Sequence, residues 1–335
     1  MFRIILLLLV IVPQFLRSQD IQFSQFYANA LYLNPAFAGS THATRGIFHQ
    51  RLQWPSLDAK YITTSISADV FFDKFNSGLG ILAFKDWQGS NTINSGELHL
   101  IYSYELSISP TFSFRAGFQG GYVSRTIDYA QLTFPDQYTN RGFQNISTQE
   151  QFINDRKNLF DVSTGGLLYS SNFYIGFSGH HLTQPQQSFY NRDSRLPFKG
   201  TAVTGYKFDF SRRTASTLQH RKEIYLTPTL HYKWQGKSDQ FDAGVYFQYD
   251  RLLIGGWYRG LPLLKEYRNK LQNNESVVAL IGYKIYGLTI SYSYDFTLSK
   301  LIVARTGGSH ELNVTYVVDW PKRRNPRKKL PCPDL

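Results

Sequence analysis

Hydrophobic and polar residues alternate along most of this chain with a period of two. From Leu288 to Phe296, apolar side chains at every second position are separated by threonine, serine and aspartate. This period predicts a β-strand with one apolar and one polar face, because successive side chains of a strand point to opposite sides. After a polar, glycine-containing connection, the alternation resumes from Glu311 to Tyr316. The two segments are predicted to be neighbouring antiparallel strands.

The same alternation predicts strands along the whole chain, and most of them have a length that crosses an outer membrane when the strand is tilted. They are expected at 46–54, 62–70, 79–87, 97–106, 112–122, 159–169, 173–182, 201–208, 224–233, 241–249, 252–259, 277–285, 288–296 and 311–316. Their number is even, as is typical of single-chain bacterial barrels. An apolar face could also meet a second sheet in a soluble sandwich, and the strand pattern alone does not choose between these folds.

The predicted connections mostly alternate between long and short. The long ones are 125–158, 183–197 and 260–275, and the short ones are 170–172, 250–251 and 286–287. An up-and-down barrel requires this order when its long loops leave one rim and its tight turns leave the other. The connection 209–223 does not fit, because it is long and falls on the tight-turn rim. The predicted fold class is all-β, a transmembrane up-and-down antiparallel β-barrel of about fourteen strands.

The beginning of the chain favours the membrane barrel. Arg3 lies near the start, an apolar core follows from Ile4 to Val12, and the chain then reaches Pro13 and the polar residues Arg17, Ser18 and Gln19. This core is too short to span a bilayer as a helix, which takes about 20 residues, and it fits the apolar region of a secretory signal peptide. We therefore predict that residues 1–19 are a cleaved signal peptide. The alternative, a buried amino-terminal strand or helix, would not need the charged start and the polar end.

Composition agrees with a barrel. The chain has 335 residues, enough for one large barrel or two ordinary domains. Aromatic residues make up 16% of it, yet its mean hydropathy is only -0.31. An apolar outer band with aromatic girdles around a polar lumen reconciles these values, although an aromatic-rich secreted sandwich could also show them. Cys332 is the single cysteine, so no intrachain disulfide can form, and a closed barrel needs none.

Two further segments flank the predicted barrel, which spans 43–319. Residues 20–42 are rich in Gln, Asn and aromatic residues without a clean period, and we interpret them as an irregular lead-in and possible plug. Residues 320–335 form a basic tail, predicted to be periplasmic, whose six Lys and Arg residues and one Asp supply +5 of the net charge of +12. This tail is either solvated or in contact with an acidic periplasmic partner or anionic lipid head groups. Nucleic acid is not an expected partner, because an exported membrane chain does not meet it.

The sequence offers no candidate for catalysis, cofactor binding or a metal site. His180 and His181 are adjacent on a predicted strand and would point to opposite faces, as would His310 and Glu311, so neither pair could chelate one metal ion. Asp295 is interpreted as part of a polar wall network rather than as a general base. No G-x-S-x-G, H-E-x-x-H or phosphate-loop spacing occurs. We predict a non-enzymatic protein without a cofactor.

Three separated segments carry a family resemblance. They are QFSQFYANALYLNPAFAG at 22–39, HLTQP at 181–185 and YSYDFTLSKLIVARTGGSHELNVTY at 292–316. Together they resemble the PorP/SprF family, outer-membrane components of the type IX secretion and gliding machinery of Bacteroidetes. Ala28 and Asn29 depart slightly from the family pattern, which has a bulky apolar residue followed by Asn. The motif residues, with structural or partner-contact roles, are Asn34, Pro35, Gly39, His181, Pro185, Asp295, Gly307, Gly308, Ser309, His310 and Glu311.

The resemblance implies a barrel in the cell outer membrane of the kind seen in fatty-acid transporters. It implies a role in the secretion or surface anchoring of cargo that bears a type IX sorting domain. Implied partners are that cargo, outer-membrane lipids and, for core machine parts, periplasmic ring or peptidoglycan-binding proteins. Two alternatives stay open: a channel for small hydrophobic or polar molecules, and a scaffold that links the membrane to periplasmic secretion machinery through the basic tail.

The predicted polar faces suggest how cargo would bind. We expect a water-filled lumen that a folded β module or an extended peptide enters from outside, with the three long loops as its rim. The groups expected to line it are Asp69, Glu97, His99, Glu105, Arg115 and Asp295.

Overall fold

The computed structural model describes residues 20–144, 147–152, 154–189, 193–211, 222–236, 238–268, 271–298 and 306–318. The predicted signal peptide at 1–19, the basic tail at 320–335 and Cys332 lie outside the described residues. No helix in the described part of the chain is long and apolar enough to cross a membrane.

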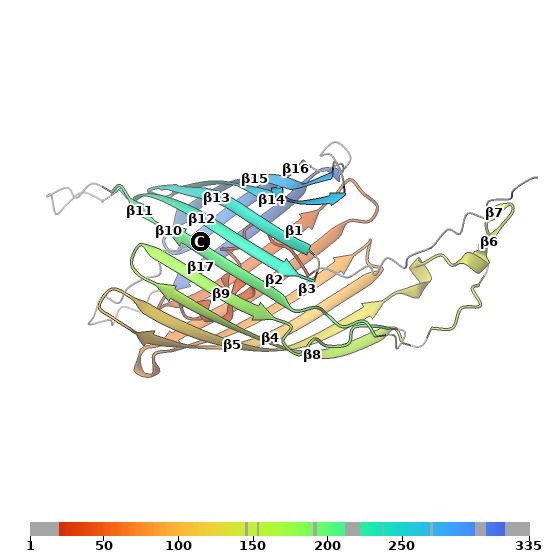
Figure 1. Cartoon of the computed structure of the whole chain (residues 1–335), viewed down its shortest axis with the longest axis horizontal. Helices are drawn as coiled ribbons and strands as arrows, with labels where there is room; N and C mark the ends of the chain where they lie inside the picture. The colour runs from red at the N-terminus through yellow and green to blue at the C-terminus, as the bar shows by residue number, and fades with distance from the viewer. Residues whose placement is uncertain are drawn as a thin grey trace, which may run out of the picture.

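Fourteen strands of the described chain form a closed antiparallel barrel in which each strand pairs with its neighbours in sequence (Figure 1). They are β1 (Thr44–Gln53), β2 (Tyr61–Phe72), β3 (Ser77–Gln88), β4 (Ile93–Ser107), β5 (Ser113–Ile127), β8 (Arg156–Tyr169), β9 (Phe173–His180), β10 (Lys199–Tyr206), β12 (Ile224–Gln235), β13 (Ser238–Tyr249), β14 (Leu252–Arg268), β15 (Leu271–Ile285), β16 (Leu288–Thr297) and β17 (Ser309–Val318). Pairing of β1 with β17 closes the ring, so that no strand keeps a free edge. The predicted fold class is confirmed.

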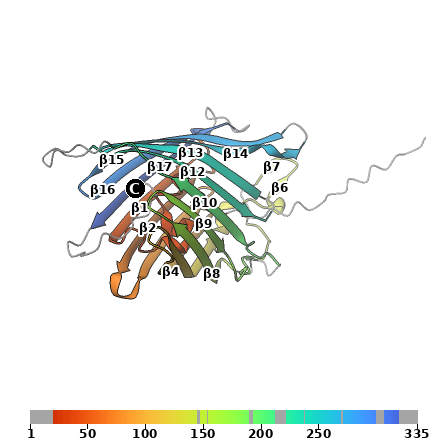
Figure 2. The ribbon, with the colours of Figure 1, turned by 60° about the vertical axis from the view of Figure 1, so that its left-hand side comes forward.

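The barrel has two unlike ends. The segments 128–155 and 181–198 leave the end that we call the long-loop rim, whereas tight turns such as 170–172, 250–251 and 286–287 leave the short-turn rim. A small hairpin of β6 (Tyr138–Thr139) and β7 (Gly142–Phe143) lies outside the barrel, well beyond the strands in Figure 1 and near the end of β14 in the turned view of Figure 2. A two-residue strand, β11 (Phe208–Asp209), extends the β12 pairing at the opposite rim.

The predicted loop at 260–275 is wrong. The strands β14 and β15 continue as a paired hairpin to Arg268 and from Leu271. Their pairing shifts in register between Arg259 and Gly260 and again beyond Leu261. Each shift breaks the period of two, so the alternation of apolar and polar residues disappears although the backbone stays paired.

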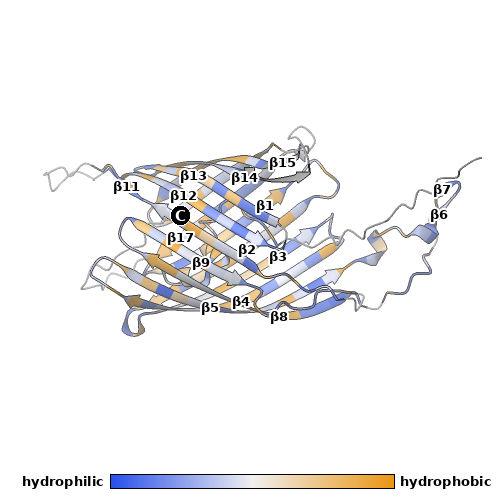
Figure 3. Ribbon diagram, viewed as in Figure 1, coloured by the Kyte–Doolittle hydropathy of each residue, from blue (hydrophilic) through white to orange (hydrophobic). Residues whose placement is uncertain are grey.

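The outer surface of the barrel is apolar, as the alternation predicts. Side chains predicted to share the apolar face of β4 all point outward, and Leu100 is 66% exposed. The same holds for Ile290, Tyr292 and Phe296 on β16, and their polar neighbours Ser291 and Ser293 are buried inside. Figure 3 shows this change of hydropathy from residue to residue along the strands. An apolar exterior of this kind is what lipid-facing strands require.

The interior is filled by the lead-in, which runs through the barrel from one rim to the other. Asp20 lies at the long-loop rim beside Lys199, and Gly39 lies near the short-turn rim beside Asp69. Between them the lead-in forms one short helix, α1 (Ala30–Leu33), and one 3-10 turn, η1 (Pro35–Phe37). Its apolar side chains pack against inward-facing residues of the wall in two buried clusters. The expectation of a water-filled interior is therefore wrong over most of its length.

The wall makes room for the lead-in with glycines. Gly117 on β5 lies against the backbone of Pro35 and Ala36, where a Cβ atom would overlap both residues. Gly78 faces the carbonyl of Ala38 in the same way. By contrast, a Cβ atom added at Gly120 on the same strand would meet no atom within 4 Å. Close approach of two backbones is a common reason for glycine within a strand.

We expect the substitution Gly117→Ala to loosen the lead-in, because the new methyl group needs the space of the Pro35 and Ala36 backbone. The measurement is maleimide labelling of Ser40→Cys, a site 2% exposed in the native fold, in a Cys332→Ser background. Labelling should be faster with Gly117→Ala and unchanged with the matched variant Gly120→Ala. Equal labelling rates in the two glycine variants would show that the close approach at Gly117 does not position the lead-in.

Candidate functional site

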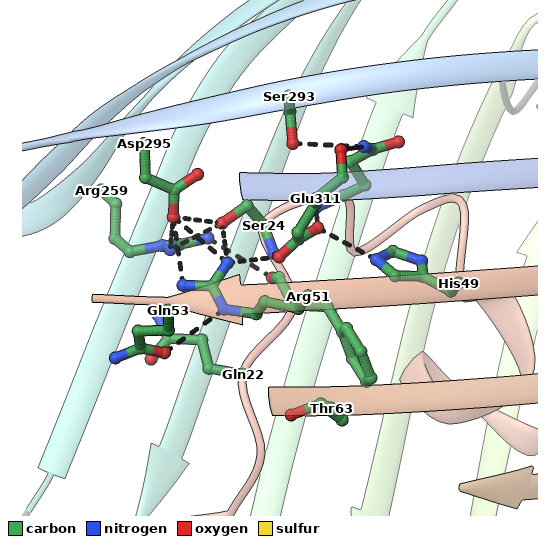
Figure 4. A network of polar contacts seen from close by, with 12 residues as sticks. Gln22, Ser24, His49, Arg51, Gln53, Thr63, Arg259, Ser293, Asp295 and Glu311 are labelled. Atoms are coloured by element: carbon green, nitrogen blue, oxygen red, sulfur yellow. Dashed lines mark hydrogen bonds and ion pairs between the residues drawn. The ribbon is translucent and has the colours of Figure 1, made fainter. Parts of the chain in front are cut away.

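Four charged side chains of the wall meet inside the barrel at the first residues of the lead-in (Figure 4). Arg51 on β1 and Glu311 on β17 are direct partners in the strand pairing, so both project inward side by side. Arg259 on β14 and Asp295 on β16 approach from the neighbouring wall, with Arg259 Nη1 3.2 Å from Asp295 Oδ2. We call these four residues the Glu311 cluster.

The Glu311 carboxylate binds the backbone of the lead-in. It accepts hydrogen bonds from the backbone N–H groups of Ser24 and Gln25, the latter at 2.8 Å. It also pairs with Arg51, and His49 Nε2 lies 3.1 Å away. The Ser24 hydroxyl in turn donates to Asp295. All six residues are almost completely buried, so the carboxylate replaces water for two amide groups that would otherwise be costly to bury.

Arg259 of the Glu311 cluster also forms a second buried ion pair, with Asp242. Arg259 Nε donates to Asp242 Oδ1 at 2.9 Å, and Asp242 also lies 3.0 Å from His231 Nδ1. Phe26 of the lead-in stacks on the His231 ring. Buried ions persist only when paired and hydrogen-bonded, because the desolvation penalty is large. The cluster is thus a rigid polar support, which agrees with the interpretation of Asp295 as part of a wall network.

The middle of the lead-in is held through its backbone. The Asn34 side chain donates to the carbonyls of Gly166 and Phe177 at 3.1 and 3.0 Å and accepts from Ala36 N–H at 2.8 Å. Pro35 follows as the first residue of η1. Gly39 has φ +67° and donates its N–H to Asp69 at 2.7 Å.

The expected lumen-lining group Arg115 also binds the lead-in. Its two Nη atoms donate to the carbonyls of Gly39 and Ala38 at 3.0 and 2.9 Å. Most of the groups that were predicted to line an open lumen therefore hold the lead-in instead.

The outer end of the lead-in is held by a second group of charges, the Asp20 cluster. The Asp20 carboxylate lies 2.6 Å from His181 Nε2 and 2.9 Å from Lys199 Nζ. His181 Nδ1 lies 2.8 Å from Asp161. Burial disfavours the charged imidazolium, but the carboxylates of Asp20 and Asp161 outweigh it and raise the pKa of His181 to about 9. Despite burial, Lys199 and His181 hold the pKa of Asp20 well below its usual value.

The prediction that His180 and His181 point to opposite faces is wrong. Strand β9 ends at His180, and His181 has a positive φ of 58°. The strand alternation is lost at this point, so both rings line the same cavity, with their centroids 6.5 Å apart. Pro185 lines that cavity as well.

The last motif lies at the turn before β17. Gly307 and Gly308 have φ +73° and +69°, and the Gly308 carbonyl accepts from Trp54 N–H at 2.9 Å. Ser309 begins β17. His310 faces outward, where its Nδ1 lies 2.7 Å from Tyr292 Oη, so His310 and Glu311 do point to opposite sides. The motif thus joins a turn of the wall to the Glu311 cluster.

Several residues of the site escaped the sequence prediction. Arg51, Arg259 and His49 were not proposed, and neither were Asp20 and Lys199. Charged residues at inward positions of a strand were a usable signal, since Arg51 precedes the outward-facing Leu52 and Arg259 follows the outward-facing Tyr258. The contacts of Asp20 and Lys199, 179 residues apart, depend on the path of the lead-in and had no local signal.

We expect Glu311→Gln to destabilise the folded barrel by about 1–3 kcal/mol, because Arg51 then pairs only with Asp295 and the buried N–H groups of Ser24 and Gln25 lose a charged acceptor. The measurement is the temperature at which the compact, folded band is lost in gel electrophoresis after heating in detergent. The matched control is Asp193→Asn, since its 3.4 Å pair with Arg195 is exposed. A pair of that kind contributes little, so its loss should leave this temperature unchanged. The same unfolding temperature for Glu311→Gln and the native chain would contradict the supporting role of the cluster.

The Asp20 cluster should make the outer end of the lead-in sensitive to alkaline pH. The pKa of His181 is about 9 in the folded chain and about 6.5 when unfolded, so its protonation stabilises the fold. That contribution is complete below about pH 6.5 and is lost as the pH rises through about 9. A spin label at Gln22→Cys, in the Cys332→Ser background, should therefore become more mobile between pH 7 and 10. His181→Gln should be mobile at both pH values, and a label that is equally immobile in both chains would contradict the prediction.

The chain is similar to known proteins in sequence and in structure. A family model described as type IX secretion system membrane protein PorP/SprF matches residues 16–316. No curated protein sequence matches the chain. The outer membrane protein Omp33 of Acinetobacter baumannii is similar in structure at 9% identity with a TM-score of 0.44, over 84% of this chain and 100% of that one.

Two other solved structures are similar to the same degree. A deletion mutant of the monoaromatic hydrocarbon channel TodX has 10% identity and a TM-score of 0.44, over 86% of this chain and 92% of that one. CdiB from Acinetobacter baumannii has 8% identity and a TM-score of 0.43, over 82% and 60%. The family match covers most of the sequence, including the lead-in and both clusters that hold it. The chain belongs to the PorP/SprF family of type IX secretion system membrane proteins.

Proposed function

We propose that this outer-membrane barrel, a component of the type IX secretion system, binds a sorting-domain-bearing cargo protein at its long-loop rim. It is needed for secretion of that cargo or for its attachment to the cell surface. The observation that carries the proposal is the lead-in, which occupies the barrel interior and leaves the two rims as the surfaces that a partner protein can reach. Proteins of this family are non-enzymatic in general, and the role proposed is binding.

The segment 128–155 has features suited to this role. Tyr129 stacks on Phe152 with ring centroids 4.0 Å apart, and Phe134 packs against the same ring at 5.2 Å. Tyr138 and Phe143 on the small hairpin are 56% and 47% exposed. Exposed aromatic side chains are enriched where proteins bind one another. A two-stranded hairpin of this kind also has edges to which a partner could add a strand.

The closed interior also bears on the alternatives. A channel for small molecules requires an open path, and the lead-in fills that path with side chains that are nearly all buried. A scaffold acting through the basic tail depends on residues 320–335, which lie outside the described residues. We therefore propose an anchor rather than a conduit. Its further partners within the secretion system would be periplasmic ring or peptidoglycan-binding proteins at the short-turn rim.

We expect replacement of residues 130–152 by a short Gly-Ser linker to abolish cargo attachment without unfolding the barrel. In a strain that lacks the native gene, the complementing variant should leave one sorting-domain protein absent from the surface or released to the medium. Substitution of the turn 170–172 by a linker of equal length is the matched control, because it alters the opposite rim. Surface proteins should be counted by mass spectrometry, together with the proteins that co-purify with the barrel from native membranes. Normal amounts of every sorting-domain protein on the cell surface would overturn the proposal.

A further inference from the structure

A cavity of about 370 Å³, including the part open to solvent, lies between the lead-in and one side of the wall. The wall contributes residues close to the long-loop ends of β10, β12 and β13. The lead-in contributes six residues between Ile21 and Leu33. We call this space the Lys233 cavity, after a lysine of its lining. Any molecule that enters it touches both the wall and the segment that fills the barrel.

The lining of the Lys233 cavity is positively charged. Lys199 on β10 and Lys233 on β12 both belong to it, and no Asp or Glu occurs among the described residues that line it. Lys199 is balanced from outside the lining, because its Nζ lies 2.9 Å from Asp20. Lys233 forms no ion pair or hydrogen bond with any residue that the structure describes. One ammonium group of the cavity is thus left without a partner.

Neighbouring carboxylates do not neutralise Lys233. Glu275 on β15 attracts it without forming an ion pair, and Glu275 Oε1 lies 3.0 Å from Gln22 Nε2 instead. Asp242 on β13 is engaged by Arg259, whose Nε donates to it at 2.9 Å. An ammonium group at a cavity forms strong, charge-assisted hydrogen bonds with an anionic ligand. The charge of the lining therefore selects an anion.

A second, independent observation marks the same cavity. His231 is 5% exposed and lines it, and its Nε2 atom has no hydrogen-bond partner in the described part of the chain. The other ring nitrogen lies 3.0 Å from the Asp242 carboxylate, which accepts, so Nδ1 carries a hydrogen in either form of the ring. A buried polar atom without a partner costs free energy until one arrives.

A carboxyl group fits His231 Nε2 in both forms of the ring. A carboxylate oxygen accepts a hydrogen bond from the protonated imidazolium, and a carboxylic acid donates one to the neutral imidazole. The two arrangements contain the same atoms and the same net charge, since they differ only in which partner holds the proton. The fit therefore does not depend on the protonation state of the ring.

Apolar and aromatic side chains form much of the remaining lining. The Phe23 ring packs edge-on against Tyr32 with centroids 5.1 Å apart, and the Phe26 ring stacks on His231 at 4.8 Å. Leu33 lies in the same lining. Apolar walls around a few polar groups are typical of sites for small organic molecules. A hydrated inorganic anion gains nothing from such walls, whereas a hydrocarbon stem is removed from water by them.

We propose that the Lys233 cavity binds a small organic carboxylate, with its head group between Lys233 and His231. Its apolar stem lies against the Phe23 and Phe26 rings of the lead-in. One such ligand pairs with the free ammonium group and gives Nε2 its missing partner. The source is either a free short-chain acid or the carboxyl terminus of a polypeptide that ends in an apolar residue. The cavity would bind this group whether or not the barrel anchors cargo.

The test is isothermal titration calorimetry of the intact protein in lipid nanodiscs, with empty nanodiscs as the blank. The probes are hexanoate, its neutral analogue hexanamide, acetate, and the peptide acetyl-Gly-Gly-Leu with a free carboxyl terminus. Hexanoate or the peptide should bind about tenfold or more tightly than both hexanamide and acetate. Binding of hexanoate identifies a free acid as a sufficient ligand, whereas binding of the peptide alone identifies the end of a polypeptide.

Variants separate this site from general surface charge. Lys233→Gln and Lys233→Met should reduce the preference for the charged probe over hexanamide to nearly none, because each removes the unpaired ammonium group. Lys60→Gln is the matched control, since it removes an exposed lysine at the same rim and should keep the preference. The compact band in gel electrophoresis shows that each variant is folded.

Three results would overturn the proposal. The first is equal affinity of the native chain for hexanoate, the peptide and hexanamide, which would show that the cavity does not select a carboxylate. The second is acetate binding as tightly as hexanoate and the peptide, which would show that the apolar walls hold no stem. The third is an unchanged preference in folded Lys233→Gln or Lys233→Met, which would place the binding elsewhere.

Discussion

The carboxylate of Glu311 joins the wall of the barrel to the chain that fills it. It accepts from two backbone amides of the lead-in and pairs with Arg51 of the first strand, while it belongs to the last strand. The two strands that close the ring therefore present the group that fixes the plug. A carboxylate buried this deeply is stable only while all its partners are present. Closure of the barrel and docking of the lead-in consequently depend on one another.

The outer face was predictable because lipid imposes a simple rule. Residues such as Leu100 and Ile290 had to be apolar and their neighbours did not, and this produces the period of two that marks the strands. The inner face obeys no such rule, since it meets a chain segment rather than water. Tyr246, Trp257 and Leu280 point inward and pack on the lead-in, so strands β13 to β15 carry apolar residues on both faces beside their buried charges. Apolar residues on both faces of a strand are a sequence signal of a filled interior. This signal did not enter the prediction.

The contacts of the lead-in were not predictable for a different reason. Residues 20–42 have no period, because each side chain fits a local feature of the wall: Asn34 bridges two strands, and Ala36 faces a glycine. The two contacts of Asn34 relate positions more than 100 residues apart in the chain. Only the closed ring brings them together. The position of the His181 ring was unpredictable for a similar, more local reason. The strand alternation ends there, and the positive φ of His181 turns its ring into the cavity.

The three segments that carry the family resemblance meet in space along one path. The first is the lead-in itself, the second contributes His181 to the Asp20 cluster, and the third contributes Asp295 and Glu311. The resemblance therefore follows the plug and its two points of attachment rather than the lipid-facing surface. A wall that served only as a pore would not need buried charges directed at its own amino-terminal segment. The interior of this barrel is built to hold a chain in place, which is why we propose that other proteins bind at the rim.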